Sequence, residues 1–180
     1  MTPEELARFI RTSLNREPVI EIDGLGHFAR NSQGRIRLLK SNRPRAFVAY
    51  ASEDGLAADR LCDALEQQGW SAWLDRRKLL PGQNWPRRIE DAIASSDCFI
   101  ACFSTRSVNK RGGFQAEVRY ALDCARRVPL DDTFIVPVRL DDCRVPNRIQ
   151  GEIQYVDLFP DWNAGMQKVF GILESQRKAA

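Results

Sequence analysis

The stretch CFIACFSTRSVNKRGGFQAEVRYAL, residues 98–122, decides the fold class of this chain. Its first six residues carry no charge, which predicts a strand buried on both faces of a sheet. A polar, glycine-bearing loop follows at residues 104–113, and apolar residues then recur at helical spacing from Phe114 onward. We expect Glu117 in the first turn of that helix, just beyond the carboxyl end of the strand. Ligands of open α/β sheets bind at that edge, so Glu117 is a candidate catalyst, although acidic residues also favour first helical turns for purely structural reasons.

The composition indicates one globular domain with an appendage. The chain has 180 residues, and 43% of them are hydrophobic, which is enough for a sizeable core. No uncharged run approaches the roughly 20 residues that span a bilayer, and the N-terminus lacks a signal-peptide pattern. We therefore expect a cytoplasmic protein without membrane contact. The net charge of +3 is small and the arginines are dispersed, which argues against nucleic acid as a partner.

Cysteine and histidine usage excludes several classes of catalytic site. The five cysteines form no CxxC pair and two of them lie in the expected core strand, which favours reduced thiols in a cytosolic protein. The single histidine, His27, leaves no basis for most Ser-His-Asp, Cys-His and multi-histidine metal schemes. Paired aspartates at 131–132 and 141–142 are typical of turns, so we expect no metal site.

Residues 1–40 are expected to form a small separate helix and β-meander unit, joined by a polar linker at 41–45 to the main domain at 46–180. Thr2-Pro3-Glu4-Glu5 predicts a capping box at the start of an amphipathic helix. Short strands are expected at 19–22, 27–30 and 35–39. Because such a unit buries little surface, we expect it to pack on the main domain or on a partner. The GxGxxG/A match at 24–29 is rejected as a dinucleotide site, because no helix begins inside it.

The main domain alternates strands with helices. Strands are expected at 46–50, 70–74, 98–103, 134–140 and 153–158, and helices at 52–68 (capped by Ser52), at 85–95, after residue 113 and at 163–176. This alternation predicts an α/β fold with a five-stranded parallel sheet flanked by helices, in the flavodoxin-like order 2-1-3-4-5. The third strand ends without the acceptor aspartate of a response-regulator receiver. The acidic pair Glu53-Asp54 after the first strand would repel the phosphate that a flavodoxin binds there.

Several motifs in order, over roughly residues 45–175, resemble bacterial members of the Toll/interleukin-1 receptor (TIR) family. They are FVAYASED at 47–54, WLD at 73–75, LLPGQNW at 79–85, the segment 107–117, VPVRLDDC at 136–143 and QYVDL at 154–158. The first is similar to the first box of the family, LLPGQNW to its BB loop, and 107–117 to the segment that leads to the active-site glutamate. One departure is Gly113, where many members have tryptophan; Phe114 is interpreted as the replacement.

The resemblance implies an NAD hydrolase that splits the nicotinamide–ribose bond, giving nicotinamide and ADP-ribose or a cyclic isomer. It further implies activation by assembly and a role in bacterial immune-type signalling such as antiviral defence. Glu117 takes the catalytic role, and one carboxylate is physically sufficient because the pyridinium leaving group needs no general acid. NAD is the substrate, and no cofactor is expected. Lys78 is expected near the phosphates and Phe114 against a ring; the full set of expected ligand-binding residues is Tyr50, Ala51, Ser52, Asp75, Lys78, Ser104 and Phe114.

The alternative is a non-catalytic adaptor that signals through homotypic or heterotypic TIR contacts. Either reading involves self-association through the apolar, turn-forming tip of the BB loop, which comprises Leu79, Leu80, Pro81 and Gly82. An unidentified activator protein is a further expected partner. A third hypothesis is that residues 1–40 recognise a DNA end or a partner protein.

Overall fold

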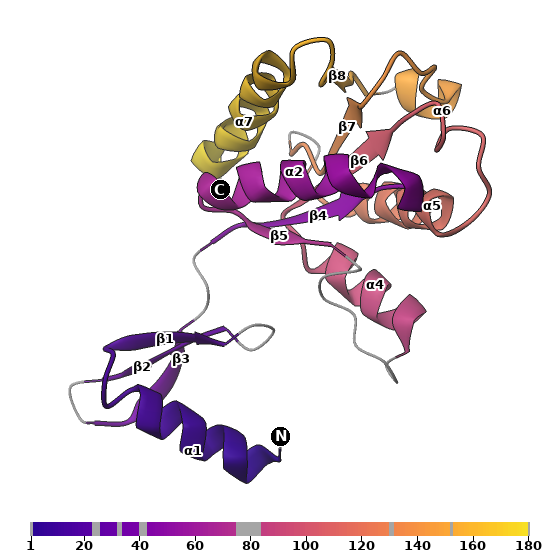
Figure 1. Ribbon diagram of the computed structural model, residues 1–180. Coiled ribbons are helices and arrows are strands. Elements are labelled where there is room, and N and C mark those ends of the chain that lie inside the picture. Colours follow the sequence, from indigo (N-terminus) through magenta and orange to yellow (C-terminus); the bar gives the residue numbers. More distant parts are fainter. Residues whose placement is uncertain are drawn as a thin grey trace. The chain divides into compact units, whose positions relative to one another are not determined.

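The structure is a computed structural model that describes residues 2–22, 26–31, 34–39, 43–74, 84–129, 132–151 and 153–179. The chain divides into two compact units, Met1–Arg43 and Pro44–Ala180 (Figure 1). This division falls within the expected linker, of which residues 41 and 42 lie outside the described residues.

The first unit is one helix on a three-stranded antiparallel sheet. Its elements are α1 (Pro3–Ser13), β1 (Val19–Ile22), β2 (Gly26–Arg30) and β3 (Ile36–Leu39), in the sheet order β1-β2-β3. The capping box is present: the backbone N–H of Glu5 donates to Thr2 Oγ1 at 3.2 Å, and the Glu5 carboxylate accepts from the Thr2 backbone at 2.7 Å. A small core joins the helix to the sheet and contains Ile10, Leu14 and Ile20.

The second unit contains a five-stranded parallel sheet in the order β5-β4-β6-β7-β8, which confirms the predicted order. Its elements in chain order are β4 (Arg45–Ala49), the 3₁₀ turn η1 (Ser52–Asp54), α2 (Gly55–Gln67), β5 (Ser71–Trp73), α4 (Trp85–Ala94), β6 (Cys98–Phe103), α5 (Gly113–Ala125), β7 (Ile135–Arg139), α6 (Asn147–Gln150), β8 (Val156–Asp157) and α7 (Trp162–Ala179).

Strand β6 lies at the centre of the sheet, and all six of its residues are buried. Ile100 and Cys102 belong to the core under α2 and α7, whereas Phe99 and Phe103 belong to the core under α4 and α5. Figure 1 shows helices on both sides of this sheet. Burial on both faces explains why the strand carries no charge. The five cysteines are all buried and free.

Three expectations about local structure were wrong. Ser52 does not cap α2, because a 3₁₀ turn precedes that helix and the Ser52 hydroxyl donates to Glu53 Oε2 at 3.0 Å. Glu117 is the fifth residue of α5 and lies in its second turn, because the helix begins at Gly113. The fifth strand has only two residues, Val156–Asp157.

A half-buried charge cluster lies at the far edge of the sheet. Arg139 of β7 donates from Nε to Asp157 Oδ1 at 2.6 Å and from Nη2 to Oδ2 at 3.0 Å, so it joins β7 to the short strand β8. Its guanidinium also stacks on the rings of Tyr155 and Phe159, at 4.6 and 5.1 Å from their centroids. These contacts hold the last strand where only two ladder positions pair.

Among the described residues, no helix combines the length and the apolar character needed to cross a membrane.

Candidate functional site

A pocket of about 190 Å³ lies beyond the carboxyl ends of β4 and β6. Three stretches of the chain line it: the segment after β4, the loop after β6 and the first two turns of α5. The lining residues are Tyr50, Ala51, Ser52, Ser107, Lys110, Arg111, Gly112, Gly113, Phe114 and Glu117. The parallel sheet explains this meeting, because adjacent parallel strands deliver their following loops to the same edge.

A buried hydrogen bond fixes the two loops relative to each other. The Ser104 hydroxyl, at the end of β6, donates to Asp54 Oδ2 in η1 at 2.5 Å, and both side chains are buried. Ser107 Oγ accepts from the Ser104 backbone N–H at 2.8 Å, which tightens the turn after β6. On the other side, the Asp141 carboxylate accepts from the backbone N–H and the hydroxyl of Thr105, at 2.8 and 2.7 Å. Polar contacts therefore join the segments that follow β4, β6 and β7 at this edge of the sheet.

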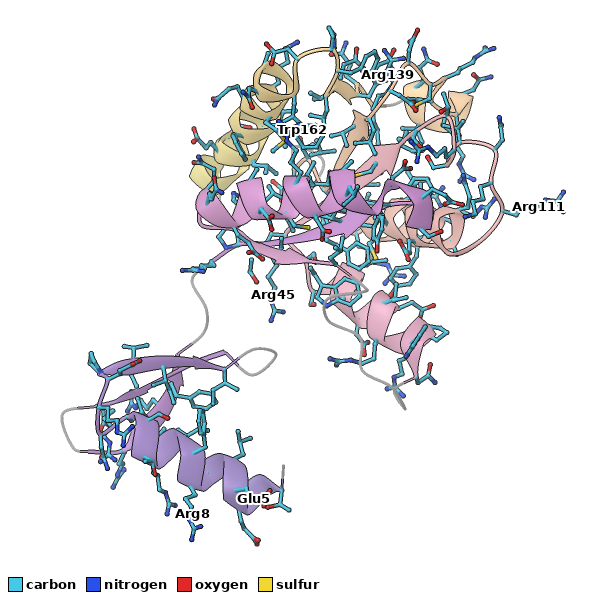
Figure 2. All side chains as sticks on the ribbon, viewed as in Figure 1. Glu5, Arg8, Arg45, Arg111, Arg139 and Trp162 are labelled. Atoms are coloured by element: carbon cyan, nitrogen blue, oxygen red, sulfur yellow. The ribbon has the colours of Figure 1, made fainter. Side chains whose placement is uncertain are left out.

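The rim of the pocket carries positive charge. Lys110 Nζ donates to Glu53 Oε1 at 2.6 Å, to Glu53 Oε2 at 2.8 Å and to Ser52 Oγ at 3.2 Å. The hydrogen bond from Lys110 lowers the pKa of the Glu53 carboxyl to about 2. Arg111 is exposed, and Figure 2 shows its side chain extending outward from the loop before α5. Of the two basic residues at the rim, Lys110 is thus paired with Glu53, and the Arg111 side chain extends outward.

Glu117 presents a carboxylate to the pocket from the second turn of α5. The side chain is half-buried, and a Cβ placed on Gly113 would lie 3.8 Å from Glu117 Oε1. A side chain at position 113 would therefore lie in van der Waals contact with the carboxylate.

Two aromatic residues belong to both the pocket and the core. Phe114 is buried and contacts Phe103 edge-to-face, with ring centroids 5.4 Å apart. Tyr50 is half-buried and packs against the core under α2. Both rings therefore contribute to the core as well as to the pocket wall.

The structure brings five of the expected site residues together in the pocket lining, namely Tyr50, Ala51, Ser52, Phe114 and Glu117. Ser104 is not among the lining residues, since its hydroxyl is buried against Asp54. Asp75, Lys78 and the BB-loop tip, Leu79 to Gly82, lie outside the described residues.

Five lining residues were not predicted as site residues: Ser107, Lys110, Arg111, Gly112 and Gly113. The signal that could have found them is a pair of cations followed by two glycines between a buried strand and a helix. Within the part of the chain that the structure describes, no three His, Cys, Asp or Glu side chains gather as a metal site would require.

Comparison with known proteins gives one consistent result. A family model described as "TIR domain" matches residues 46–170. A curated relative, the uncharacterized protein y4cD of Sinorhizobium fredii (strain NBRC 101917 / NGR234), is 25% identical over 117 residues, which are 65% of this chain but only 18% of that protein.

Two solved structures share the fold. The TIR domain of the Toll-related receptor TRR-2 from Hydra magnipapillata matches with a TM-score of 0.59 at 22% identity, over 73% of this chain and 97% of that one. A metazoan TIR-STING receptor from C. gigas matches with a TM-score of 0.57 at 21% identity, over 71% of this chain and 38% of that one.

Proposed function

The chain belongs to the TIR domain family, and we propose that its pocket cleaves NAD at the bond between nicotinamide and ribose. The observation that carries the proposal is the position of Glu117, whose carboxylate lines a partly open pocket together with Tyr50 and Ser52 from the first box. A carboxylate in such a site, without a second acid among the lining residues, suits a reaction that develops positive charge and needs no proton donor.

The proposed reaction requires few protein groups besides the Glu117 carboxylate. The bond between ribose C1′ and the pyridinium nitrogen breaks, and its electron pair goes to nicotinamide, which leaves neutral. The ribose becomes an oxocarbenium-like cation, which Glu117 stabilises while its oxygens hold the ribose hydroxyls. Water then adds to C1′ and loses a proton, giving ADP-ribose; attack by a nitrogen of the adenine instead gives a cyclic isomer.

The size of the pocket supports binding of one end of the dinucleotide. Pockets that enclose a drug-sized ligand measure about 300–1,000 Å³, whereas this one measures about 190 Å³. We therefore place the nicotinamide ring and its ribose in the pocket, with the ring against Phe114. The diphosphate then passes the rim at Lys110 and Arg111, and Asp75 and Lys78 of the BB loop complete the site when chains assemble.

The test is nicotinamide release from NAD, measured by chromatography on the purified full chain with and without a crowding agent. Glu117→Gln preserves the shape of the side chain and removes its charge, so we expect turnover to fall by about 10²- to 10³-fold, as when one preorganised electrostatic group is removed. Glu174→Gln, at an exposed position on α7, is the matched control and should leave turnover unchanged. A wild-type chain that releases no nicotinamide even when assembled would refute the proposal.

A second candidate function is a non-catalytic TIR adaptor. The observation that favours it is a pair of exposed apolar side chains in the α/β unit: Leu56 of α2 is 87% exposed and Trp85 of α4 is 53% exposed. Substitution of Gly82 in the BB loop separates the two functions. Loss of both self-association and turnover supports an enzyme that assembles through this loop into an immune-type signalling complex in the cytoplasm. Loss of partner binding, with no turnover in any state, supports the adaptor.

A further inference from the structure

One ion pair at the pocket rim joins two segments of the chain. Lys110 lines the pocket, and its ammonium group donates to both oxygens of the Glu53 carboxylate, at 2.6 and 2.8 Å. Glu53 itself is not among the lining residues, whereas Ser52, a third acceptor of Lys110 at 3.2 Å, is one of them. A cation in the pocket wall is thus neutralised by a carboxylate that stands outside the pocket.

This ion pair can open without disturbing the fold. The two side chains are 45% and 43% exposed, and ion pairs at that exposure contribute little to stability. The backbone of Glu53 is anchored separately, because its carbonyl oxygen accepts from Arg106 Nη1 at 3.1 Å and the next residue, Asp54, is held by Ser104. Only the Glu53 carboxylate has to move to release Lys110.

Charge makes phosphate the ligand that would compete for Lys110. Glu53 is ionised at neutral pH, since the hydrogen bond from Lys110 lowers its pKa to about 2. The carboxylate occupies the amine and repels an approaching anion. A phosphate group offers equal or greater negative charge and additional acceptor oxygens, so it can take over the ammonium group, whereas an uncharged ring or sugar cannot.

We propose that Lys110 is the phosphate subsite of the pocket and that Glu53 is a built-in competitor, which a phosphate of the substrate displaces. The proposal rests on the proposed NAD cleavage for the identity of the substrate, while the competition itself needs only a phosphate-bearing ligand. It makes Glu53 a specificity-determining residue: ribosides that carry a phosphate gain the contact with Lys110, and ribosides without one gain nothing.

The experiment is titration calorimetry on the purified full chain with three probes: ADP-ribose, inorganic pyrophosphate and uncharged nicotinamide. Glu53→Gln removes the competing charge, Lys110→Met removes the subsite, and the double variant tests whether the two act on each other. Glu174→Gln on α7 controls for net charge, because it removes one exposed carboxylate that does not line the pocket. All three substitutions are at exposed positions, and thermal unfolding checks that each variant folds.

We expect Glu53→Gln to tighten ADP-ribose and pyrophosphate binding by about two- to fivefold, the range that opening one exposed ion pair allows. Lys110→Met should weaken both by at least as much. In the double variant, Glu53→Gln should bring a smaller gain than in the wild type, because only the charge repulsion is relieved. Nicotinamide binding should be unchanged in every variant.

Weaker phosphate binding in Glu53→Gln would overturn the proposal, because Glu53 would then orient Lys110 rather than compete for it. Unchanged binding in Lys110→Met, or no binding of either phosphate probe by the wild type, would overturn it as well. The outcome is separable from the proposed reaction. Nicotinamide release without an effect of Glu53 removes only the competition, whereas competition for pyrophosphate without nicotinamide release removes only the proposed reaction.

Discussion

Replacing Asp54 by alanine should destabilise the α/β unit and loosen the pocket at the same time. Asp54 and Ser104 are both buried, and the Ser104 hydroxyl donates to the Asp54 carboxylate at 2.5 Å, across the two segments that line the pocket. Arg106 adds a long contact, with its Nε 3.9 Å from Asp54 Oδ1. Asp54→Ala leaves the buried hydroxyl of Ser104 without this acceptor.

The expected magnitude follows from that single contact. A hydrogen bond to a charged group contributes about 1.5–3 kcal/mol, and an unsatisfied buried donor costs about 1–3 kcal/mol. We expect Asp54→Ala to lower the free energy of unfolding by about 2–3 kcal/mol. For a chain of this size, each kcal/mol corresponds to about 2–4 °C in Tm, so the shift should be about 5–10 °C downward. Asp54→Asn keeps an acceptor oxygen and should lose about half as much.

Tryptophan fluorescence is a suitable readout, because all four tryptophans lie in the α/β unit. Urea and thermal unfolding of Asp54→Ala, Ser104→Ala and the double variant give a thermodynamic cycle. We expect the double variant to lose less than the sum of the two single variants, by about 1 kcal/mol or more. Asp132→Ala, at an exposed aspartate, is the control and should stay within about 0.5 kcal/mol of wild type.

Two results would refute this reasoning. The first is a loss below about 0.5 kcal/mol for Asp54→Ala, which is the size of an ordinary surface substitution. The second is strict additivity in the cycle, which would mean that the two side chains do not depend on each other for stability.

Three further predictions concern single positions. Gly165→Ala in α7 should lower the free energy of unfolding by about 2 kcal/mol or more, because a Cβ there would overlap the backbone of β8. Gly171→Ala in the same helix meets no atom within 4 Å and should raise the free energy of unfolding by about 0.5–1 kcal/mol. Chemical denaturation of the two variants measures both changes. Gly112→Ala should cost about 1–3 kcal/mol in the same assay, because Gly112 has a φ of 144°. The Glu53 carboxyl should titrate in a carbon NMR experiment near pH 2 and move toward its ordinary value of 4.5 in Lys110→Met. Because the folded pKa of Glu53 is depressed, the stability that its ion pair with Lys110 contributes is present above about pH 4.5 and is lost as the pH falls toward 2. If the Glu53 pKa in Lys110→Met stayed at the wild-type value, the ion pair would be contradicted.

Much of the fold could be predicted from local patterns. The uncharged run at β6 predicted a strand covered on both faces, and the capping box at Thr2 predicted the start of α1. The predicted helix boundaries were wrong where short polar side chains had more than one possible hydrogen-bond partner. Ser52 could have capped α2, but its hydroxyl instead meets Glu53, and the start of α5 moved to Gly113.

Only those site residues that belong to a recognisable sequence motif could be predicted. Glu117 and the first-box residues were found because each belongs to a recognisable motif beside a strand end. Lys110 and Arg111 were missed as lining residues, because a charged loop has no periodicity from which to predict which of its residues line a pocket. Ser104 was expected at the ligand, and its buried bond to Asp54 gives it a supporting position instead.

The sequence by itself determined the order and type of the elements of the α/β unit, because hydrophobic periodicity and caps are local properties of the chain. It also determined the family, through motifs spread from β4 to α7. Only the tertiary structure decided which polar and charged side chains meet. The bond between Asp54 and Ser104 and the pair of Glu53 with Lys110 each join residues that are 50 or more positions apart. Such pairs arise because parallel strands bring distant loops to one edge, and no local pattern records that meeting.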